Sequence, residues 1–503
     1  MSQAVVSVNV GILLPVLAPA LGAAAVLVTD VAVQHLRRAH YVIALVSLVV
    51  GVLGTLAGLG MAAGEVRRTL CLPGGGQCMY VADSVVSTLQ IAALLAAGLT
   101  LLLSWPDDKK ELPGNTAVIV SLVLAATAGA TAVAGARDVG SWLVALELAT
   151  LPTVALVALR GARSAISGAI ALLTAALVSF ALLAFSAALW FTATGSGFLT
   201  PAAALHGFND PVRRPILVLS VVVAIAGIGF KLSLVPFHAW TPEAYDGAPL
   251  PMAAFLAGVS KIAALAALLV MIRAIPLGAP PLDAIAIVAA VSMTLGNIMA
   301  LRQNGVVRLL AWSTVAQAGW VVLPLAAVSS AAVHASGAYL LAYVLATLLA
   351  FAVVAALVQI WGPTRARDLA EYRGLLGEHP VLASALGLAL LSLAGLPPGF
   401  LGLVAKVVAL RPVVTSELWL LAIVAAVNAV LGVAVYLRWL LIVVSTPDAS
   451  AQVAPLSVPG GAGPVAALAV RVHPATLVAV GLSAVALVLT SLNPQLLLGL
   501  LGR

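Results

Sequence analysis

The chain has 503 residues, of which 63% are apolar and 8% are charged, and its mean hydropathy is +1.18. A soluble protein carries about 25% charged residues, so a water-soluble fold of this length would lack the polar groups to cover its surface. The same numbers exclude a disordered chain, and the two cysteines are too few for a disulfide-based scaffold. The composition therefore predicts an integral membrane protein made mostly of spans. The net charge of +7 is typical of loop residues that orient such a chain and does not indicate nucleic-acid binding.

Long apolar runs predict helices and not a β-barrel, because a bilayer core about 30 Å thick needs about 20 apolar residues per helix. We therefore expect an all-α polytopic membrane protein with about fourteen transmembrane helices. The expected spans lie near 9–29, 41–63, 84–105, 115–136, 138–159, 165–193, 215–238, 250–273, 281–301, 305–328, 334–361, 380–411, 417–443 and 474–499. The longest polar loops are expected at 195–214, 362–379 and 444–473, and the composition of the last is typical of a flexible connection.

The distribution of basic residues predicts how the chain is oriented. The first span lacks a basic leading region and a cleavage site, so we expect it to be retained. An even number of spans then places both termini on one side, and the loops of the opposite side carry more Lys and Arg. Cytoplasmic loops carry the excess, so both termini are expected outside. Cys71 and Cys78 would lie in the outer loop 64–83, where a disulfide and two free thiols are both compatible with the sequence.

The sequence contains none of the short motifs that mark a bound nucleotide or redox group. It has no Walker loop, no CxxC pair, no haem-attachment CxxCH and no dinucleotide fingerprint on a strand. We therefore expect no cofactor-binding or metal-binding residues in this chain.

Four ionisable residues fall within predicted spans and away from their ends: Glu147, Lys231, Lys261 and Lys406. Arg438 is closer to the inner end of its span, where its long side chain can reach the interface. An ion in hydrocarbon costs several kcal/mol, so such residues face the protein interior and usually mark an ion route. The structural alternative is a salt bridge that only holds helices together. Three lysines with one glutamate favour transport over that alternative.

Lysine suits such a route chemically. In a site of low dielectric constant its amine can gain and lose a proton near neutral pH, and a glutamate beside it favours the charged form. Moving the pair apart or together would therefore change the affinity for protons. An arginine could not take part, because it does not deprotonate.

Helix-breaking prolines accompany two of these lysines. Pro236 follows Lys231, and Pro397 and Pro398 precede Lys406. Broken helices at corresponding places of two halves are typical of transporters built from inverted repeats. The sequence thus predicts two inverted five-helix repeats with broken helices seven and twelve, although prolines also kink ordinary membrane helices. The expected organisation is a three-helix segment at 1–114, repeats at 115–280 and 281–445, and a loop with a last helix at 446–503.

Three further polar residues are candidates near these charges. His238 follows Lys231 by seven residues, or two helical turns, so it would continue a polar line from that lysine. Its imidazole titrates near neutral pH and suits a proton relay, but a hydrogen-bonded structural histidine fits as well. Ser260 and Thr314 lie near the middle of spans, where most hydroxyls bond to the helix backbone.

Several stretches resemble one known family. The run FKLSLVPFHAWTPEAYDGAPLP, followed by FLAGVSKIAALAALL, looks like the core of the antiporter-like subunits of respiratory complex I, and its form is most similar to subunit N. Three more stretches agree in order: LELATLPTVALVAL, GNIMALRQNGVVRLLAWSTVAQAGW and YRGLLGEHPVLASALGLALLSLAGLPPGFLGLVAK. The resemblance extends from about residue 115 to 445, and the three further N-terminal spans look like the bacterial form of the subunit.

The resemblance implies which residues form the site. Glu147 matches the glutamate of the fifth span, Lys231 its partner in the seventh and Lys261 the central lysine of the eighth. Lys406 matches the lysine of the twelfth span, where one sister subunit has a glutamate. The implied site is a proton relay, with His238 as a further candidate member.

Three positions depart from the family. Ala169 stands where relatives carry a lysine, Val307 also replaces a lysine, and Gln317 replaces a histidine before the Gly-aromatic pair. We therefore expect the proton line to depend more on water and hydroxyl groups in this chain.

The resemblance also implies the function and its setting. It implies a proton-translocating membrane-arm subunit of NADH:quinone oxidoreductase, with NADH, FMN, iron–sulfur clusters and quinone in other subunits. The implied partners are neighbouring antiporter-like membrane subunits, the peripheral arm and the lipid of a bacterial cell membrane. The alternatives are a subunit of a cation/proton antiporter, a related membrane-bound oxidoreductase, and a scaffolding subunit. Sodium exchange would require carboxylates and backbone oxygens, of which the lysine-rich interior offers few.

Overall fold

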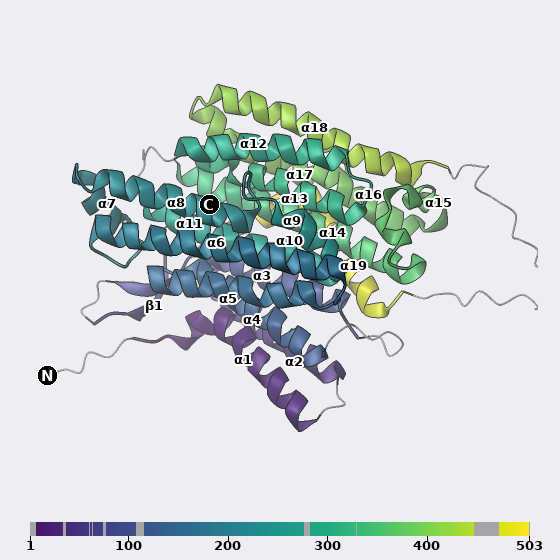
Figure 1. The fold of residues 1–503 in the computed structure, drawn as a ribbon, viewed down its shortest axis with the longest axis horizontal. Helices are drawn as coiled ribbons and strands as arrows, with labels where there is room; N and C mark the ends of the chain where they lie inside the picture. Colours follow the sequence, from purple (N-terminus) through teal and green to yellow (C-terminus); the bar gives the residue numbers. More distant parts are fainter. Residues whose placement is uncertain are drawn as a thin grey trace, which may run out of the picture.

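Thirteen helices in the part of the chain that the structure describes are long and apolar enough to cross a membrane. In this computed structural model the described residues are 7–33, 37–59, 61–62, 64–73, 77–106, 115–275, 282–327, 329–446 and 472–501. The helices run side by side in an elongated bundle, with α12 and α18 along one edge and α1 and α2 at the opposite edge (Figure 1). The bundle confirms the prediction of a multi-pass, mostly helical membrane protein.

The elements follow one another in this way. The longer helices are α1 (Val10–Ala32), α2 (Arg37–Thr55), α3 (Ser84–Leu103), α4 (Thr116–Gly135), α5 (Val139–Ala158), α6 (Arg163–Thr194), α8 (Arg214–Leu232), α11 (Val259–Ala274), α12 (Leu282–Leu301), α13 (Val306–Val322), α14 (Ser330–Trp361), α16 (Pro380–Ala394), α17 (Phe400–Thr415), α18 (Trp419–Val444) and α19 (Pro474–Leu492). The shorter elements are α7 (Pro201–Asn209), α9 (Trp240–Gly247), α10 (Leu250–Ala257), α15 (Leu375–Glu378), α20 (Gln495–Leu498), η1 (Leu56–Gly58), η2 (Leu323–Ala326), η3 (Arg365–Arg367), η4 (Leu369–Tyr372), η6 (Gly499–Leu501) and the strands β1 (Arg67–Cys71) and β2 (Cys78–Ala82).

One of the fourteen expected spans has no single counterpart among the long apolar helices. The expected span 380–411 is two helices, α16 and α17, because the chain stops being helical at Ala394 and resumes at Phe400. The other thirteen expected spans correspond to the thirteen long apolar helices. The span expected at 215–238 ends early, since α8 stops at Leu232.

Two expected loops also contain regular structure. The segment 195–214 contains the helix α7, which Thr200 caps by accepting a hydrogen bond from the Ala203 amide. The segment 64–83 contains the antiparallel strands β1 and β2, so the fold is not purely helical. Of the expected loop 444–473, residues 447–471 lie outside the described part of the chain.

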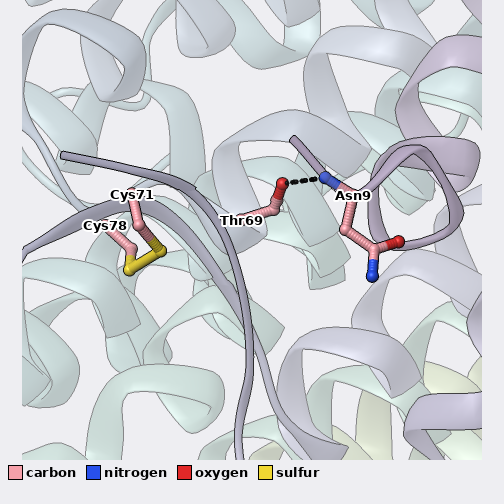
Figure 2. Close-up of a disulfide and its surroundings, with 4 residues drawn as sticks. All are labelled: Asn9, Thr69, Cys71 and Cys78. Atoms are coloured by element: carbon pink, nitrogen blue, oxygen red, sulfur yellow. Dashed lines mark hydrogen bonds between the residues drawn. A yellow bond between two sulfur atoms is a disulfide. The ribbon is translucent and has the colours of Figure 1, made fainter. Parts of the chain in front are cut away.

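The β-hairpin carries the two cysteines. A disulfide joins Cys71 to Cys78, which face each other across the two strands (Figure 2). The hairpin also holds the segment before α1, because the amide of Asn9 donates a hydrogen bond of 2.8 Å to the hydroxyl of Thr69 (Figure 2). The hairpin and the start of α1 therefore lie at the same end of the bundle, as the alternation of spans requires.

Burial separates central helices from peripheral ones. Helices α11, α13 and α14 are buried over most of their length, whereas α6, α18 and α19 are buried on about a third of it. The outward faces of the peripheral helices present apolar side chains, for example Phe185 of α6, Leu420 of α18 and Leu482 of α19. A lipid-facing surface has this character, because lipid tails are as apolar as leucine. The three lysines of the predicted relay are instead buried in the protein interior.

The end of the bundle away from the hairpin is held by ion pairs. Asp246 at the end of α9 lies 3.3 Å from Arg367 of η3 and 3.8 Å from Arg308 of α13. Arg438 of α18 donates hydrogen bonds to the carbonyls of Leu301 and Gln303, which closes the end of α12. The two pairs of Asp246 connect the α9 segment with helices that come much later in the chain.

Candidate proton-transfer site

Glu147 and Lys231 meet in the interior as an ion pair. The Nζ of Lys231, on α8, lies 2.9 Å from Oε1 of Glu147 on α5 and 2.8 Å from the hydroxyl of Thr150, one turn later on α5. Lys231 is 6% exposed, so the ammonium group depends on these two partners and not on bulk water. A carboxylate and a hydroxyl on one face of α5 thus hold a lysine from another helix.

Lys261 approaches the same place from α11. Its Nζ donates one hydrogen bond of 2.9 Å to the backbone carbonyl of Lys231 and one of 2.5 Å to the hydroxyl of Ser233. That hydroxyl also accepts a hydrogen bond from Thr241. The ring of Trp240 lies 4.7 Å from the ammonium group, a distance at which a cation is attracted to an aromatic face. Lys231 and Lys261 are therefore joined through one short backbone segment.

The end of α8 explains why Lys261 binds there. The last carbonyls of a helix have no partner within the helix and carry partial negative charge. Helix α8 ends at Leu232, and Ser233 takes the left-handed conformation with φ of 67°. The carbonyl of Lys231 is thereby left to accept a proton donor from another helix, and Lys261 supplies it.

Lys406 is held in a similar way in the second half. Its Nζ donates a hydrogen bond of 2.5 Å to the carbonyl of Ala394, the last residue of α16. The next residue, Gly395, is left-handed with φ of 78°, and a side chain there would lie 3.2 Å from the Nζ. The ring of Trp320 lies 5.7 Å from the ammonium group. Among the described residues no carboxylate forms a salt bridge with Lys406, in contrast to Lys231.

The ends of α8 and α16 share one backbone pattern. Leu234 and Leu396 each donate a backbone hydrogen bond to a carbonyl five residues earlier, at Gly229 and Leu391. Ser233 and Gly395, the residues just before, are the left-handed caps. A proline follows three residues after each cap, at 236 and 398. The two segments therefore match residue for residue over their turns.

A small cavity lies beside the Glu147–Lys231 pair. It is lined by Thr150, Lys231, Trp240 and Ser260, together with apolar residues of α6, and measures about 10 Å³. A cavity of that size has room for about one water molecule. Ser260, a candidate from the sequence, thus lies at the site.

His238 does not continue the helix of Lys231, so the expectation of a polar line along one helix was wrong. Helix α8 ends before it, and the chain turns so that the imidazole packs 5.2 Å from the ring of Trp312. Its Nδ1 is buried and has no hydrogen-bond partner among the described protein atoms. The structure brings Glu147, Lys231 and Lys261 into one connected group, while His238 and Lys406 lie outside its hydrogen bonds.

A second polar cluster was missed by the sequence reasoning. The hydroxyl of Tyr339, on α14, donates to Gln317 of α13, whose amide donates to the hydroxyl of Tyr436. One turn along α14, Tyr343 donates a hydrogen bond of 2.9 Å to Thr314. Thr314 itself donates to the carbonyl of Leu310, as expected of a hydroxyl within a helix. The available signal was the pair of tyrosines four residues apart within an apolar run.

Two of the departures from the family pattern are apolar in the structure as well. Ala169 is 6% exposed and Val307 is 1% exposed, and both pack in the hydrophobic core. Gln317, the third, is the centre of the tyrosine cluster and bonds to two hydroxyl groups. The position where the resemblance implies a histidine thus has a hydrogen-bonding side chain.

The many-span bundle with buried amines bonded to helix ends is consistent with an antiporter-like membrane protein. The family model for "NADH:quinone oxidoreductase/Mrp antiporter, TM" matches residues 136–432. That range includes Glu147, the three lysines and both interrupted segments.

Similar proteins of known name indicate which subunit of this class the chain resembles. The chain is 36% identical to the NADH-quinone oxidoreductase subunit N 2 of Streptomyces griseus, over 80% of this chain and 76% of the relative. It is 37% identical to the subunit N of Salinispora tropica, over 80% and 78% of the two chains. The chain therefore belongs to the NADH-quinone oxidoreductase subunit N family.

Solved structures agree with this assignment. A chain of respiratory complex I from Thermus thermophilus with bound aureothin has a TM-score of 0.75 and 30% identity, covering 97% of this chain and 99% of that one. A chain of the Mrp complex from Dietzia has a TM-score of 0.78 at 20% identity, covering 98% and 96%. The second likeness shows a shared fold alone.

Proposed function

We propose that this chain is a membrane-arm subunit of NADH:quinone oxidoreductase that moves protons through its buried glutamate and lysines. The observation that carries the proposal is the bond from the Nζ of Lys261 to the end of the helix that bears Lys231. With the Glu147–Lys231 ion pair, it forms a connected row of proton-binding groups across α5, α8 and α11. NADH, FMN, iron–sulfur clusters and quinone belong, in this proposal, to other subunits.

The chemistry of each residue follows from its partners. Glu147 stabilises a protonated Lys231, so any movement that separates the two releases a proton. The carbonyl of Lys231 and the hydroxyl of Ser233 stabilise a protonated Lys261, which passes the proton on along the interior. Lys406, whose ammonium is stabilised by the end of α16, exchanges the proton with one side of the membrane. His238, beside Trp312, remains a further candidate carrier.

We also propose that residues 115–280 and 281–445 are inverted repeats, with α8–α9 and α16–α17 as their broken helices. The matching turns support this, because corresponding residues of the two segments differ in number by a constant offset. Each repeat is an odd set of five spans, so the second would begin on the other side of the membrane. Residues 1–114 and 446–503 would flank the repeats.

The orientation follows from the loops. The hairpin with Cys71 and Cys78 lies at the end where α1 begins, and the opposite end carries Arg308, Arg365 and Arg367. Basic residues favour the cytoplasmic side and disulfides favour the outer side. We therefore propose a bacterial cell membrane location with both termini outside. Neighbouring antiporter-like subunits and the peripheral arm would be the partners.

Replacing Lys261 tests the proposal. We expect Lys261→Met to abolish proton uptake driven by NADH in membrane vesicles that contain the assembled complex. Lys261→Arg is the matched control, because it keeps the positive charge but does not release a proton. Both variants are expected to fail in pumping while the complex still oxidises NADH with an artificial acceptor.

The outcomes separate the alternatives. Wild-type proton uptake in Lys261→Met would disprove the relay. Restoration of uptake by Lys261→Arg would show that the charge only holds helices together. Sodium-dependent exchange by the protein without NADH would favour a stand-alone cation/proton antiporter.

A further inference from the structure

Three residues joined by hydrogen bonds make up what we call the relay group: Glu147, Lys231 and Lys261. Helix α5 begins at the hairpin end of the bundle, since Ala136, just before it, bridges to Tyr80 of β2. Helix α11 ends there, because Arg273 in its last turn pairs with Asp83, the residue after β2. The two helices therefore run in opposite directions, which fixes which of their residues lie between the relay group and the hairpin end.

The stretch between the relay group and the hairpin end is apolar on both helices. On α5, residues 142–146 precede Glu147 and carry no polar group except one indole N–H. On α11, residues 262–272 follow Lys261 and are all apolar, so that Arg273 is the next polar side chain along this helix. Water needs space and several polar partners, so packed apolar side chains exclude it.

Polar side chains accompany the relay group on the other side. Thr150 follows Glu147 on α5 and Ser260 precedes Lys261 on α11, so each lies farther from the hairpin than the charge it accompanies. Both line the cavity of about 10 Å³ that Lys231 also lines. A polar cavity thus lies on the side away from the hairpin, and apolar packing lies on the side toward it.

Trp142 is the largest side chain in the apolar stretch of α5. It is 0% exposed, and its Nε1 donates a hydrogen bond of 3.2 Å to the carbonyl of Ala267 on α11. Trp142 precedes Glu147 by five residues and Ala267 follows Lys261 by six, so this contact lies about 7–9 Å from the charges along the helices. The indole therefore spans from α5 to α11 between the relay group and the hairpin end.

The indole fills this layer without offering a route for protons. Its N–H is a donor only and is already bound to a carbonyl, so it cannot accept a proton and pass it on. Close packing of the neighbouring helix supports the same layer. A Cβ at Gly129 of α4 would lie 2.7 Å from the carbonyl oxygen of Ala145, which leaves no room for a side chain between α4 and α5.

We propose that Trp142 is a seal that prevents the relay group from exchanging protons directly with the hairpin side of the membrane. This inference rests on the proposed function and adds to it a residue that carries no proton itself. A relay group open to both sides at once would let pumped protons flow back through it. With the seal in place, Lys261 passes its proton along the interior and not straight to the hairpin side.

Proton leak in the absence of NADH tests the seal. The assembled complex is placed in phosphatidylcholine vesicles that hold a pH-sensitive dye, and the pH outside is changed in one step. We expect the inside of Trp142→Ser vesicles to equilibrate several times faster than that of wild-type vesicles, because serine leaves space and supplies a hydroxyl that binds water. Trp142→Phe should stay tight, since it keeps an apolar ring and loses only the N–H.

A double variant shows where the leaking protons pass. Lys231 is the relay residue that lines the polar cavity, so adding Lys231→Met to Trp142→Ser should return the leak to the wild-type rate. A leak through a merely loosened bundle would not respond to this second change.

Trp439→Ser is the matched control. Trp439 is also 0% exposed, but it lies on α18 against Tyr372, so its removal should leave the vesicles tight. Oxidation of NADH with an artificial acceptor checks that each variant is assembled. If Trp142→Ser does not assemble, Trp142→Gln replaces it with the same expected leak, because its amide can still donate to the carbonyl of Ala267.

A wild-type rate of equilibration in the assembled Trp142→Ser or Trp142→Gln variant would overturn the seal. An equal leak in Trp439→Ser or Trp142→Phe would overturn it as well, and so would a leak that persists with Lys231→Met. The proposed function is tested apart from the seal by NADH-driven uptake in the single variant Lys261→Met. Wild-type uptake in that variant would contradict the relay itself, whatever the leak through Trp142→Ser.

Discussion

The Nζ of Lys261 lies 2.9 Å from the backbone oxygen of Lys231, so one lysine of the site holds the helix end that carries the other. The same ammonium group bonds to Ser233, the left-handed residue that terminates α8. The ammonium group of Lys261 and the conformation of this turn therefore stabilise each other.

Substitutions of Ser233 distinguish the effect of its left-handed backbone from the effect of its hydroxyl group. A left-handed residue with a side chain costs about 1–2 kcal/mol, which glycine avoids. We therefore expect Ser233→Gly to be more stable than Ser233→Ala by about 1 kcal/mol in thermal unfolding of the complex. Both should slow proton uptake equally, because both remove the hydroxyl that binds Lys261. Normal pumping by Ser233→Gly would show that the hydroxyl is dispensable.

Gly395 provides the corresponding test in the second half. A Cβ at this residue would lie 3.1 Å from Cδ and 3.2 Å from Nζ of Lys406, so Gly395→Ala should displace the amine and reduce proton uptake. Gly362→Ala is a matched control, since it has a similarly positive φ of 85° and open space around the added carbon. Equal loss of pumping in the two variants would attribute the effect to backbone strain alone.

The Glu147–Lys231 pair predicts that replacing one partner lowers the stability of the complex more than replacing both. Removing one partner of a buried ion pair costs about 3–5 kcal/mol, because the other charge is left unpaired. Glu147→Gln should therefore lower the unfolding temperature of the complex, and the double variant Glu147→Gln/Lys231→Met should recover most of it. Neither should pump. Recovery of proton uptake in the double variant would show that the pair is purely structural.

Asp83 predicts a dependence of stability on acid. Burial alone would raise the pKa of this carboxyl, but the guanidinium of Arg273 and the amide of Val86 outweigh it and hold the pKa below its ordinary value. A group with a lowered folded pKa stabilises the protein fully above its unfolded pKa of about 3.9, and this contribution is lost as the pH falls through the folded pKa.

Asp83→Asn isolates that effect, because asparagine caps a helix about as well as aspartate. The variant should be less stable than the wild type at neutral pH, and the difference should disappear in acid below the folded pKa. Thermal unfolding of the purified complex across this range measures it. A constant difference at every pH would contradict the ion-pair explanation.

The disulfide of the hairpin predicts a stability effect without loss of transport. Closing a short loop of this kind stabilises a fold by about 2 kcal/mol. The variant Cys71→Ser/Cys78→Ser should therefore unfold at a lower temperature and still pump protons. Reductant should lower the stability of the wild type to the same level and leave the variant unchanged. A wild type indifferent to reductant would show that the bond does not form in the cell.

Much of the fold could be predicted because hydropathy reports directly on burial in lipid. Thirteen spans were placed correctly, and the intramembrane charges were found because each is an exception to an apolar run. The pairing of Lys231 with Glu147 was implied by the family resemblance, and the two form an ion pair in the structure. Orientation, repeats and the roles of the residues stay predictions.

The position of His238 and the partners of the lysines could not be predicted, because they depend on backbone turns. The spacing of His238 from Lys231 suggested one helix face, but a left-handed residue at Ser233 ends the helix between them. The hydrogen bonds of Lys261 and Lys406 go to backbone carbonyls, which every residue has, so no residue type marks them. The tyrosine cluster was missed because its members come from three separate helices.

Lys261 and Lys406 bind to the carbonyl ends of α8 and α16, which couples the protonation of each amine to the stability of that helix end. The free energy by which a helix end stabilises a protonated amine equals the free energy by which protonation stabilises that helix end. Under the proposed function, each proton that arrives would therefore tighten the turn it binds, and each departure would loosen it. Asp246 ties α9, which continues from the first of these turns, to Arg308 and Arg367 in the second half. Under the proposed function, protonation in the first half would in this way affect the stability of contacts with the second half.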